Sequence, residues 1–222
     1  MKLLNGINMA LVVKEHIAMG TLLGVWKKEE ELELLHTIFP LRSDEIADFK
    51  KISNLTRQKE WLTTRVLLTE MLEKRKIISY STHGKPFIKE SKLNISISHS
   101  RNFVAIIISS QYYPGVDIEQ VSERVANINH KFLNNTEREW CTSLPLMTAC
   151  WSAKEAVFKI FERELDFHDM VVEPFQLEPD KGQFESSITK MNPPARFKIK
   201  YRFFENDILT YTLKRPDDSL IS

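Results

Sequence analysis

Two short motifs decide the fold: GVDIE at residues 115–119 and WSAKEAVFK at residues 151–159. The first motif alternates apolar and acidic residues. Side chains two residues apart in a β-strand share a face, so Asp117 and Glu119 point one way and the apolar residues between them point the other. GVDIE therefore predicts a strand that buries one face and presents two carboxylates on the other.

The second motif predicts an amphipathic α-helix. At about 100° per residue, Glu155 and Lys159 lie on one face, together with Trp151 and Ser152. We therefore expect one face of this helix to pack and the other to present a carboxylate and a lysine. The apolar stripe on the opposite face consists of Ala153, Ala156, Val157, Ile160 and Phe161.

Length and composition indicate a folded globular protein. The chain has 222 residues, 42% of them hydrophobic and 27% charged, which is ordinary for a globular protein and argues against disorder. This length allows one large domain or two small ones. The net charge of +1 provides no overall field for nucleic acid or an anionic membrane, so any anion site must be built from local cations.

No targeting or redox motif is evident. Charged residues interrupt the apolar pieces near the N-terminus, and no run of about 18 apolar residues occurs, so we expect a cytoplasmic protein without a signal peptide or membrane span. Cys141 and Cys150 are nine residues apart, a spacing that fits neither a thiol redox motif nor a zinc site. Buried structural thiols are the expected interpretation.

Hydrophobic periodicity and turn residues predict alternating strands and helices. A break at residues 112–114 predicts two lobes, residues 1–113 and residues 114–222, with the carboxylate strand opening the second. Ser43 and either Asn135 or Thr136 are the expected N-caps of two of the helices. The predicted strands cover residues 10–26, 77–80, 94–98 and 103–108, and a hairpin covers 196–204 and 208–214. The predicted helices cover residues 28–35, 43–52, 54–74, 126–132, 136–141 and 146–163.

Each chemical signal is weak when taken alone. Acidic residues two apart occur by chance in many strands, and Glu155 with Lys159 matches an ordinary surface ion pair. Arg57 and Arg65 fit a solvated basic helix face, and His99 fits a hydrogen-bonded core histidine. Together, the carboxylates, a histidine flanked by serines and the scattered cations suggest a magnesium ion beside a phosphorylated ligand.

Four motifs in order now define a family resemblance. GKP at residues 84–86, ISISHS at 95–100, GVDIE and WSAKEAVFK together resemble the signature of the 4'-phosphopantetheinyl transferase superfamily, in its two-lobed, Sfp-like class. RQKEWLTTRVLL at residues 57–68 is similar to the N-terminal helix of that family. The resemblance implies an α+β fold, a pseudo-two-fold pair of similar α/β lobes with the ligand cleft between them. Arg101 departs from the small residue that often follows SHS in the family.

The resemblance implies transfer of the 4'-phosphopantetheine arm of coenzyme A to a serine of an apo acyl or peptidyl carrier protein. Adenosine 3',5'-bisphosphate is the implied product, magnesium the cofactor, and a monomer the expected state. The implied magnesium ligands are Asp117, Glu119 and Glu155. The implied coenzyme A contacts are Lys159 at the diphosphate, Ser98 and His99 at phosphates, Arg65 at the 3'-phosphate, Arg57 as a further phosphate contact, and Gly84, Lys85 and Pro86 at the adenine edge.

The base that deprotonates the carrier serine stays open at this stage. Glu137, which resembles a family glutamate, competes for this role with Glu155 and with a water molecule on the metal, while Lys159 would stabilise charge in the transition state. Two other functions are possible for the same residues. One is a magnesium-dependent phosphodiesterase or nuclease, and the other is a non-catalytic module that binds coenzyme A or a carrier protein.

Overall fold

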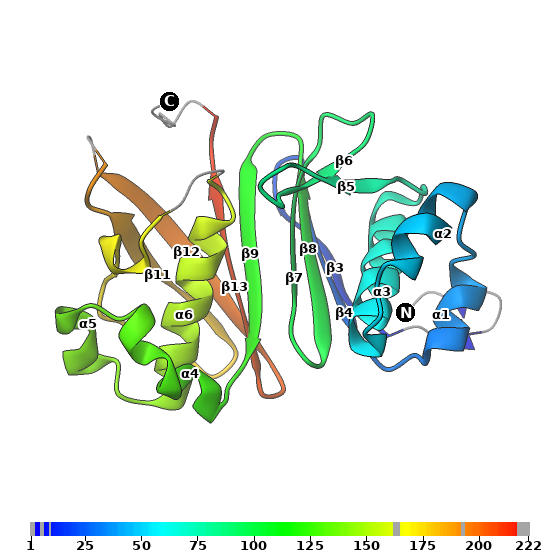
Figure 1. Cartoon of the computed structure of the whole chain (residues 1–222). Helices are drawn as coiled ribbons and strands as arrows, with labels where there is room; N and C mark the ends of the chain where they lie inside the picture. Colours follow the sequence, from blue (N-terminus) through cyan, green and yellow to red (C-terminus); the bar gives the residue numbers. More distant parts are fainter. Residues whose placement is uncertain (1–2, 5–6, 9, 162–164, 192–193, 217–222) are drawn as a thin grey trace.

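The protein has an α+β fold built from two antiparallel sheets with helices outside them, as predicted (Figure 1). The computed structural model describes residues 3–4, 7–8, 10–161, 165–191 and 194–216, with side chains from residue 10 onward. Within these ranges, no helix is both long and apolar enough to cross a membrane.

The N-terminal sheet has four strands in the order β3-β4-β8-β7, and the predicted strands in this part of the chain are confirmed. Strands β5 and β6 form a separate two-stranded hairpin around the turn at Gly84, whose φ of +81° favours glycine. Strands β1 and β2 form another separate pair. The strands are β1 (Leu3–Leu4), β2 (Ile7–Asn8), β3 (Leu11–Ala18), β4 (Thr21–Lys27), β5 (Ile78–Tyr80), β6 (Pro86–Ile88), β7 (Asn94–His99) and β8 (Phe103–Ser109).

Of the three helices on the outer side of this sheet, α3 (Leu55–Leu72) packs on β4 and β8, α1 (Leu32–Ile38) packs on α3, and α2 (Ser43–Lys50) lies between them in the chain. Helix α3 forms where helical periodicity predicts it, and the Asn54 side chain caps it by accepting a hydrogen bond from the Arg57 N–H at 3.0 Å. The predicted cap at Ser43 is wrong by one residue. Ser43 is the first residue of α2, and Glu45 instead accepts a hydrogen bond from the backbone N–H of Arg42 at 3.0 Å.

The C-terminal sheet has five strands in the order β10-β11-β12-β13-β9. Tyr113 and Pro114, expected in the break between the lobes, already pair with β13 as the first residues of β9, while the division into two lobes stays a prediction. The predicted hairpin is confirmed with a two-residue loop, while β10 and β11 were not predicted. The strands are β9 (Tyr113–Gln120), β10 (Met170–Val172), β11 (Lys181–Ile188), β12 (Ala195–Phe204) and β13 (Asp207–Lys214).

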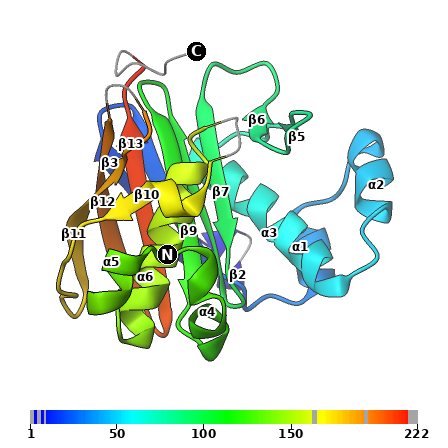
Figure 2. The same ribbon diagram turned by 60° about the vertical axis from the view of Figure 1, so that its left-hand side comes forward.

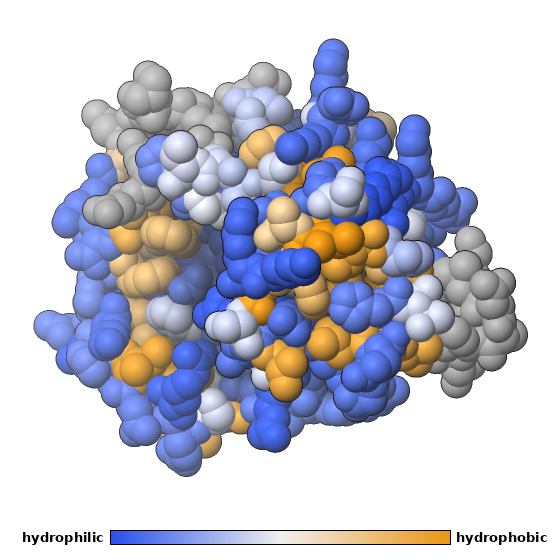
Figure 3. Space-filling view, turned by 45° about the vertical axis from the view of Figure 1, so that its right-hand side comes forward, coloured by the Kyte–Doolittle hydropathy of each residue, from blue (hydrophilic) through white to orange (hydrophobic). Residues whose placement is uncertain are grey.

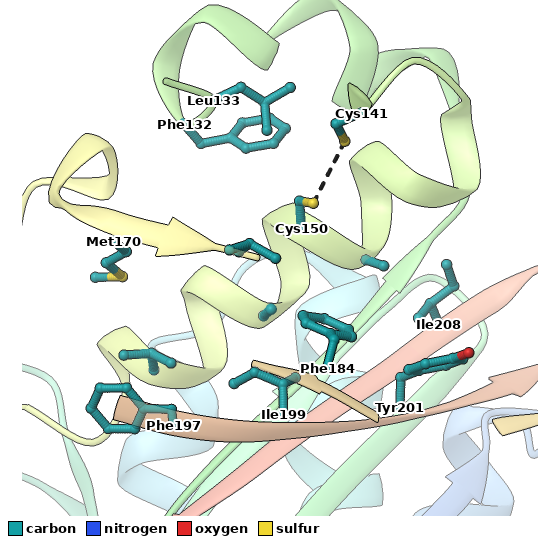
Figure 4. Packing of buried hydrophobic residues seen from close by; sticks show 14 of the residues in the cluster. Phe132, Leu133, Cys141, Cys150, Met170, Phe184, Phe197, Ile199, Tyr201 and Ile208 are labelled. Atoms are coloured by element: carbon teal, nitrogen blue, oxygen red, sulfur yellow. Dashed lines mark hydrogen bonds between the residues drawn. The ribbon is translucent and has the colours of Figure 1, made fainter. Parts of the chain in front are cut away.

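The central helix of this half is α6 (Leu144–Phe158), which packs on β9 and β13. Its core contains apolar residues from α5, α6 and the sheet, and it includes the thiols of Cys141 and Cys150, whose Sγ atoms lie 3.5 Å apart (Figure 4). Buried, free thiols were expected. The other helices are α4 (Glu123–Asn127), η1 (Asn129–Lys131), α5 (Asn135–Trp140) and η2 (Phe167–Asp169).

Several helix boundaries differ from the prediction. The helix expected over residues 28–35 is α1, which begins at Leu32 and ends at Ile38. The helix expected over residues 126–132 is divided between α4 and η1, because Ile128 leaves helical geometry at φ −105° and ψ 8°. Asn134, one residue before the expected caps, caps α5. Helix α6 ends at Phe158, so Lys159 is its C-cap residue, and residues 162–163 of the predicted helix lie outside the described residues.

The two sheets share a third apolar core, and the helices of the two halves lie on opposite outer sides (Figures 1 and 2). Strand β7 also lies beside β9, where Ser96 Oγ accepts a hydrogen bond from the Val116 N–H at 3.0 Å. The contact between α6 and β9 requires Gly115, because a Cβ there would lie 1.9 Å from the Ala156 carbonyl oxygen. The shared core consists of Leu23, Val25, Phe103, Ala105, Ile107, Val116, Ile118, Leu209 and Tyr211.

Candidate active site

The predicted alternation along β9 places Asp117 at the junction of the two halves. Val116 and Ile118 are fully buried in the shared core, and Asp117 points to the other face, where it is 4% exposed. Asp117 Oδ1 accepts hydrogen bonds from Ser98 Oγ at 2.7 Å and from Lys159 Nζ at 2.8 Å. Among the described residues, Asp117 Oδ2 is buried and has no hydrogen-bond partner.

Glu119 lies two residues along the same face and is held by two donors. Trp151 Nε1 donates to Glu119 Oε1 at 3.0 Å, and Arg124 Nη2 lies 3.0 Å from each carboxylate oxygen. Burial raises the pKa of Glu119, and the charge of Asp117 raises it further, while the two donors oppose the shift. The carboxylate is therefore held in place by α4 and α6 together.

Glu155 is the third carboxylate, and it lies on α6 one turn before Lys159. Burial, together with the charges of Asp117 and Glu119, raises the pKa of Glu155 to about 7, while Lys159 opposes the shift. The three carboxylates thus interact electrostatically although they come from different elements. Ser152, expected on the same helix face, instead bonds Thr210 of β13 at 2.8 Å, because that edge of α6 lies against the sheet.

The donors of this cluster are of the type that magnesium prefers, although their present arrangement does not bring them together around one point. All three side chains offer carboxylate oxygens, the ligands that this ion prefers, and Asp117 Oδ2 has an unused acceptor position. Within the described part of the chain, no three acidic, histidine or cysteine side chains converge closely enough to hold a metal ion. Lys159 and Arg124 are the cations now paired with Asp117 and Glu119.

A cavity of about 570 Å³ opens beside the cluster. Its walls come from α3, the turn at residues 83–86, β7 and the end of α6, so both halves of the chain contribute. Figure 3 shows the side of the molecule on which the N-terminal half comes forward, where hydrophobic side chains gather among hydrophilic ones. The predicted coenzyme A contacts that line the cavity are Arg57, Gly84, Lys85, Pro86, His99 and Lys159.

Two basic residues that line the cavity, His99 and Lys85, also contact other residues. His99 Nδ1 lies 3.7 Å from Glu60 Oε2, and partial burial lowers the pKa of His99, an effect that Glu60 opposes. Lys85 Nζ donates to the Ile160 carbonyl oxygen at 3.1 Å, which links the N-terminal turn to the C-terminal half.

Two of the predicted phosphate contacts lie elsewhere. Ser98 is 7% exposed, donates to Asp117 and accepts from the Ile118 N–H at 3.3 Å, so its hydroxyl supports β9 and does not line the cavity. Arg65 is 5% exposed and stacks on Trp61, with Cζ 3.1 Å from the ring centroid. Burial lowers the pKa of Arg65 to about 10, and its guanidinium lies behind the cavity wall that Trp61 forms.

Glu137 does not join the cluster and cannot reach a substrate hydroxyl in this structure. It is 1% exposed, and its Oε2 accepts from Lys154 Nζ at 2.7 Å and from the Asn134 N–H at 2.9 Å. Its Oε1 accepts from the Val172 N–H at 2.8 Å. These contacts give Glu137 a structural position, and they place Lys154 in the core.

Sequence reasoning missed three residues of the site. Two of them, Glu60 and Trp61, follow Arg57 by about one helical turn. The periodicity of α3 could therefore have placed them beside Arg57 on the cavity wall. Arg124 has no sequence signal, because its pairing with Glu119 depends on how the chain turns from β9 into α4.

Comparison with known proteins gives a family match over part of the chain. Residues 113–207 match the family described as the 4'-phosphopantetheinyl transferase superfamily, and this range includes the three carboxylates and Lys159. The 4'-phosphopantetheinyl transferases AcpT of Escherichia coli (strain K12) and Salmonella typhi are each 30% identical over 112 residues, which is 46% of this chain. The matches span 57% and 58% of those relatives, so the chain covers little more than half the length of either.

Proposed function

We propose that the chain, whose residues 113–207 match the 4'-phosphopantetheinyl transferase superfamily, is a member of it and modifies a carrier protein. The reaction transfers the 4'-phosphopantetheine arm of coenzyme A to a serine hydroxyl of an apo acyl or peptidyl carrier protein. The serine oxygen forms a bond to the β-phosphorus, the bond from that phosphorus to the bridging oxygen breaks, and adenosine 3',5'-bisphosphate leaves.

One observation supports this function above the others. Asp117, buried with an unpartnered oxygen, lies between Lys159 and two further carboxylates at the edge of a large cavity. A buried carboxylate without a full set of partners is costly, so its retention there is best explained by a ligand. We assign Asp117, Glu119 and Glu155 to a magnesium ion, which would neutralise diphosphate charge when bound.

The side chains have separate roles in the proposed reaction. Lys159 belongs to both the carboxylate cluster and the cavity, because its ammonium contacts Asp117 and its side chain lines the cavity. There it would stabilise charge on the diphosphate. Glu155 is the proposed acceptor of the carrier-serine proton because, of the two competing glutamates, it is the one that lies with Asp117 and Lys159 in the cluster. Glu137 is left out of the mechanism because its oxygens are used in the core.

The cavity is the proposed coenzyme A site. Arg57, Lys85 and His99 offer donors to phosphates, and the Trp61 ring offers an aromatic wall. One chain supplies both sides of the cavity, and we therefore propose that the enzyme works as a monomer.

The deciding experiment is mass spectrometry of apo carrier proteins incubated with the purified protein, coenzyme A and magnesium. We expect one phosphopantetheine mass to be added to the carrier. A carrier with its acceptor serine replaced by alanine is the control and gains nothing. Absence of added mass on every member of a panel of acyl and peptidyl carriers would overturn the proposed function.

A further inference from the structure

Arg124 pairs with one of the three site carboxylates although no motif includes it. Its Nη2 atom lies 3.0 Å from both oxygens of Glu119, and the arginine side chain is 63% exposed while that of Glu119 is 21% exposed. The guanidinium therefore covers the oxygens from the solvent side. Trp151 holds Oε1 independently, so loss of Arg124 would not leave the carboxylate unsupported.

A second observation indicates that the site is incomplete as it stands. Asp117 is 4% exposed, and within the described residues its Oδ2 has no hydrogen-bond partner. Arg124 pairs with Glu119 and leaves Asp117 Oδ2 unsatisfied. The cluster thus retains an acceptor for a further cation while Arg124 occupies Glu119.

We propose that Arg124 is an internal counter-ion that competes with the divalent cation for Glu119 and so sets the affinity of the site. This inference rests on the proposed function, because it takes Glu119 as a magnesium ligand. A guanidinium and a metal ion cannot both occupy the same lone-pair positions of the two oxygens, so a metal ion that binds Glu119 through these positions displaces Arg124. The arginine can turn into water, since most of its side chain is already exposed.

The test is calorimetric titration of the purified, full-length, metal-free protein with magnesium alone, in the absence of coenzyme A and carrier. We expect Arg124→Gln to bind magnesium about twofold to fivefold more tightly than the wild type, the range that an exposed ion pair provides. The rise in Tm that magnesium causes should be correspondingly larger in the variant.

Arg138→Gln on α5 is the matched control, because it removes the same charge from an exposed arginine that bonds the His130 carbonyl oxygen. It should bind magnesium like the wild type. Equal affinity in the wild type and Arg124→Gln, or equal tightening in both variants, overturns the role of Arg124 and leaves the metal site intact. Absence of binding in the wild type and in Arg124→Gln overturns this inference together with the proposed magnesium site.

Discussion

At the residue scale, Glu155 combines burial with two negative neighbours. Its pKa rises to about 7 because the protein shields it from water and because Asp117 and Glu119 disfavour a further charge. In the metal-free protein, this carboxyl therefore keeps its proton up to neutral pH. A bound cation would offset the cost of ionising Glu155 beside Asp117 and Glu119. A carboxyl whose pKa is raised in this way therefore suits a metal site.

Replacing Glu155 by glutamine should change the pH dependence of stability in a defined direction. The folded state holds its proton up to about pH 7, whereas the unfolded state releases it near pH 4.5, so the wild type loses stability as pH rises between these values. Glu155→Gln has no such loss. We expect its Tm without divalent cations to exceed that of the wild type by roughly 5–10 °C at pH 8 and by much less near pH 5.

Glu185→Gln provides the control for this measurement, because Glu185 is exposed on β11. The difference in Tm between this variant and the wild type should be the same at both pH values. A wild-type pH profile for Glu155→Gln would show that the carboxyl is not shielded in the way described.

At the scale of elements, α6 is joined to its surroundings by the buried ion pair of Lys154, about 100° round the helix from Glu155. Lys154 is fully buried and donates to Glu137, to the Phe132 carbonyl oxygen at 2.6 Å and to the Phe167 carbonyl oxygen at 3.1 Å. These bonds connect α6 with α5, the end of η1 and η2. These bonds therefore hold in place the helix that carries Glu155 and precedes Lys159.

Lys154→Met should lower the free energy of unfolding by about 3–5 kcal/mol, because it leaves the Glu137 carboxylate buried without its counter-charge. Urea denaturation measures this loss. The double variant with Glu137→Gln should cost less than the sum of the two single changes, since neither charge then stays buried. A loss below about 1 kcal/mol for Lys154→Met, the size expected for an exposed pair, would contradict the structural role.

The same elements show how far sequence reasoning reaches. The alternation in GVDIE and the apolar stripe of α6 are local patterns, so they correctly predicted which faces of β9 and α6 are buried. The positions of Glu137 and Arg65 depend on partners distant in the sequence or on how α3 packs, and no local pattern reports that a charged residue is buried. Strand β10 has three residues, too few for a periodic signal.

At the scale of the whole molecule, the two halves share a core instead of touching through a thin interface. Nine buried apolar residues from β4, β8, β9 and β13 form that core. Polar contacts add to it, including Arg202 with Glu15 at 2.7 Å and Asn102 with Asp207 at 3.2 Å. Separating the proposed lobes would expose this core, so we expect residues 1–113 and 114–222 to unfold as one cooperative unit.

Hydrogen exchange can test this cooperativity with reciprocal core changes. Leu67→Ala lies in the N-terminal core alone, and Ile199→Ala lies in the C-terminal core alone. Each substitution should lower the free energy of unfolding by about 2–5 kcal/mol. If the halves unfold together, either change will reduce the protection of the slowest amides in β4 and in β12 by the same amount, because those amides exchange only through global unfolding. A change that lowers protection in its own half alone would show that the lobes unfold independently.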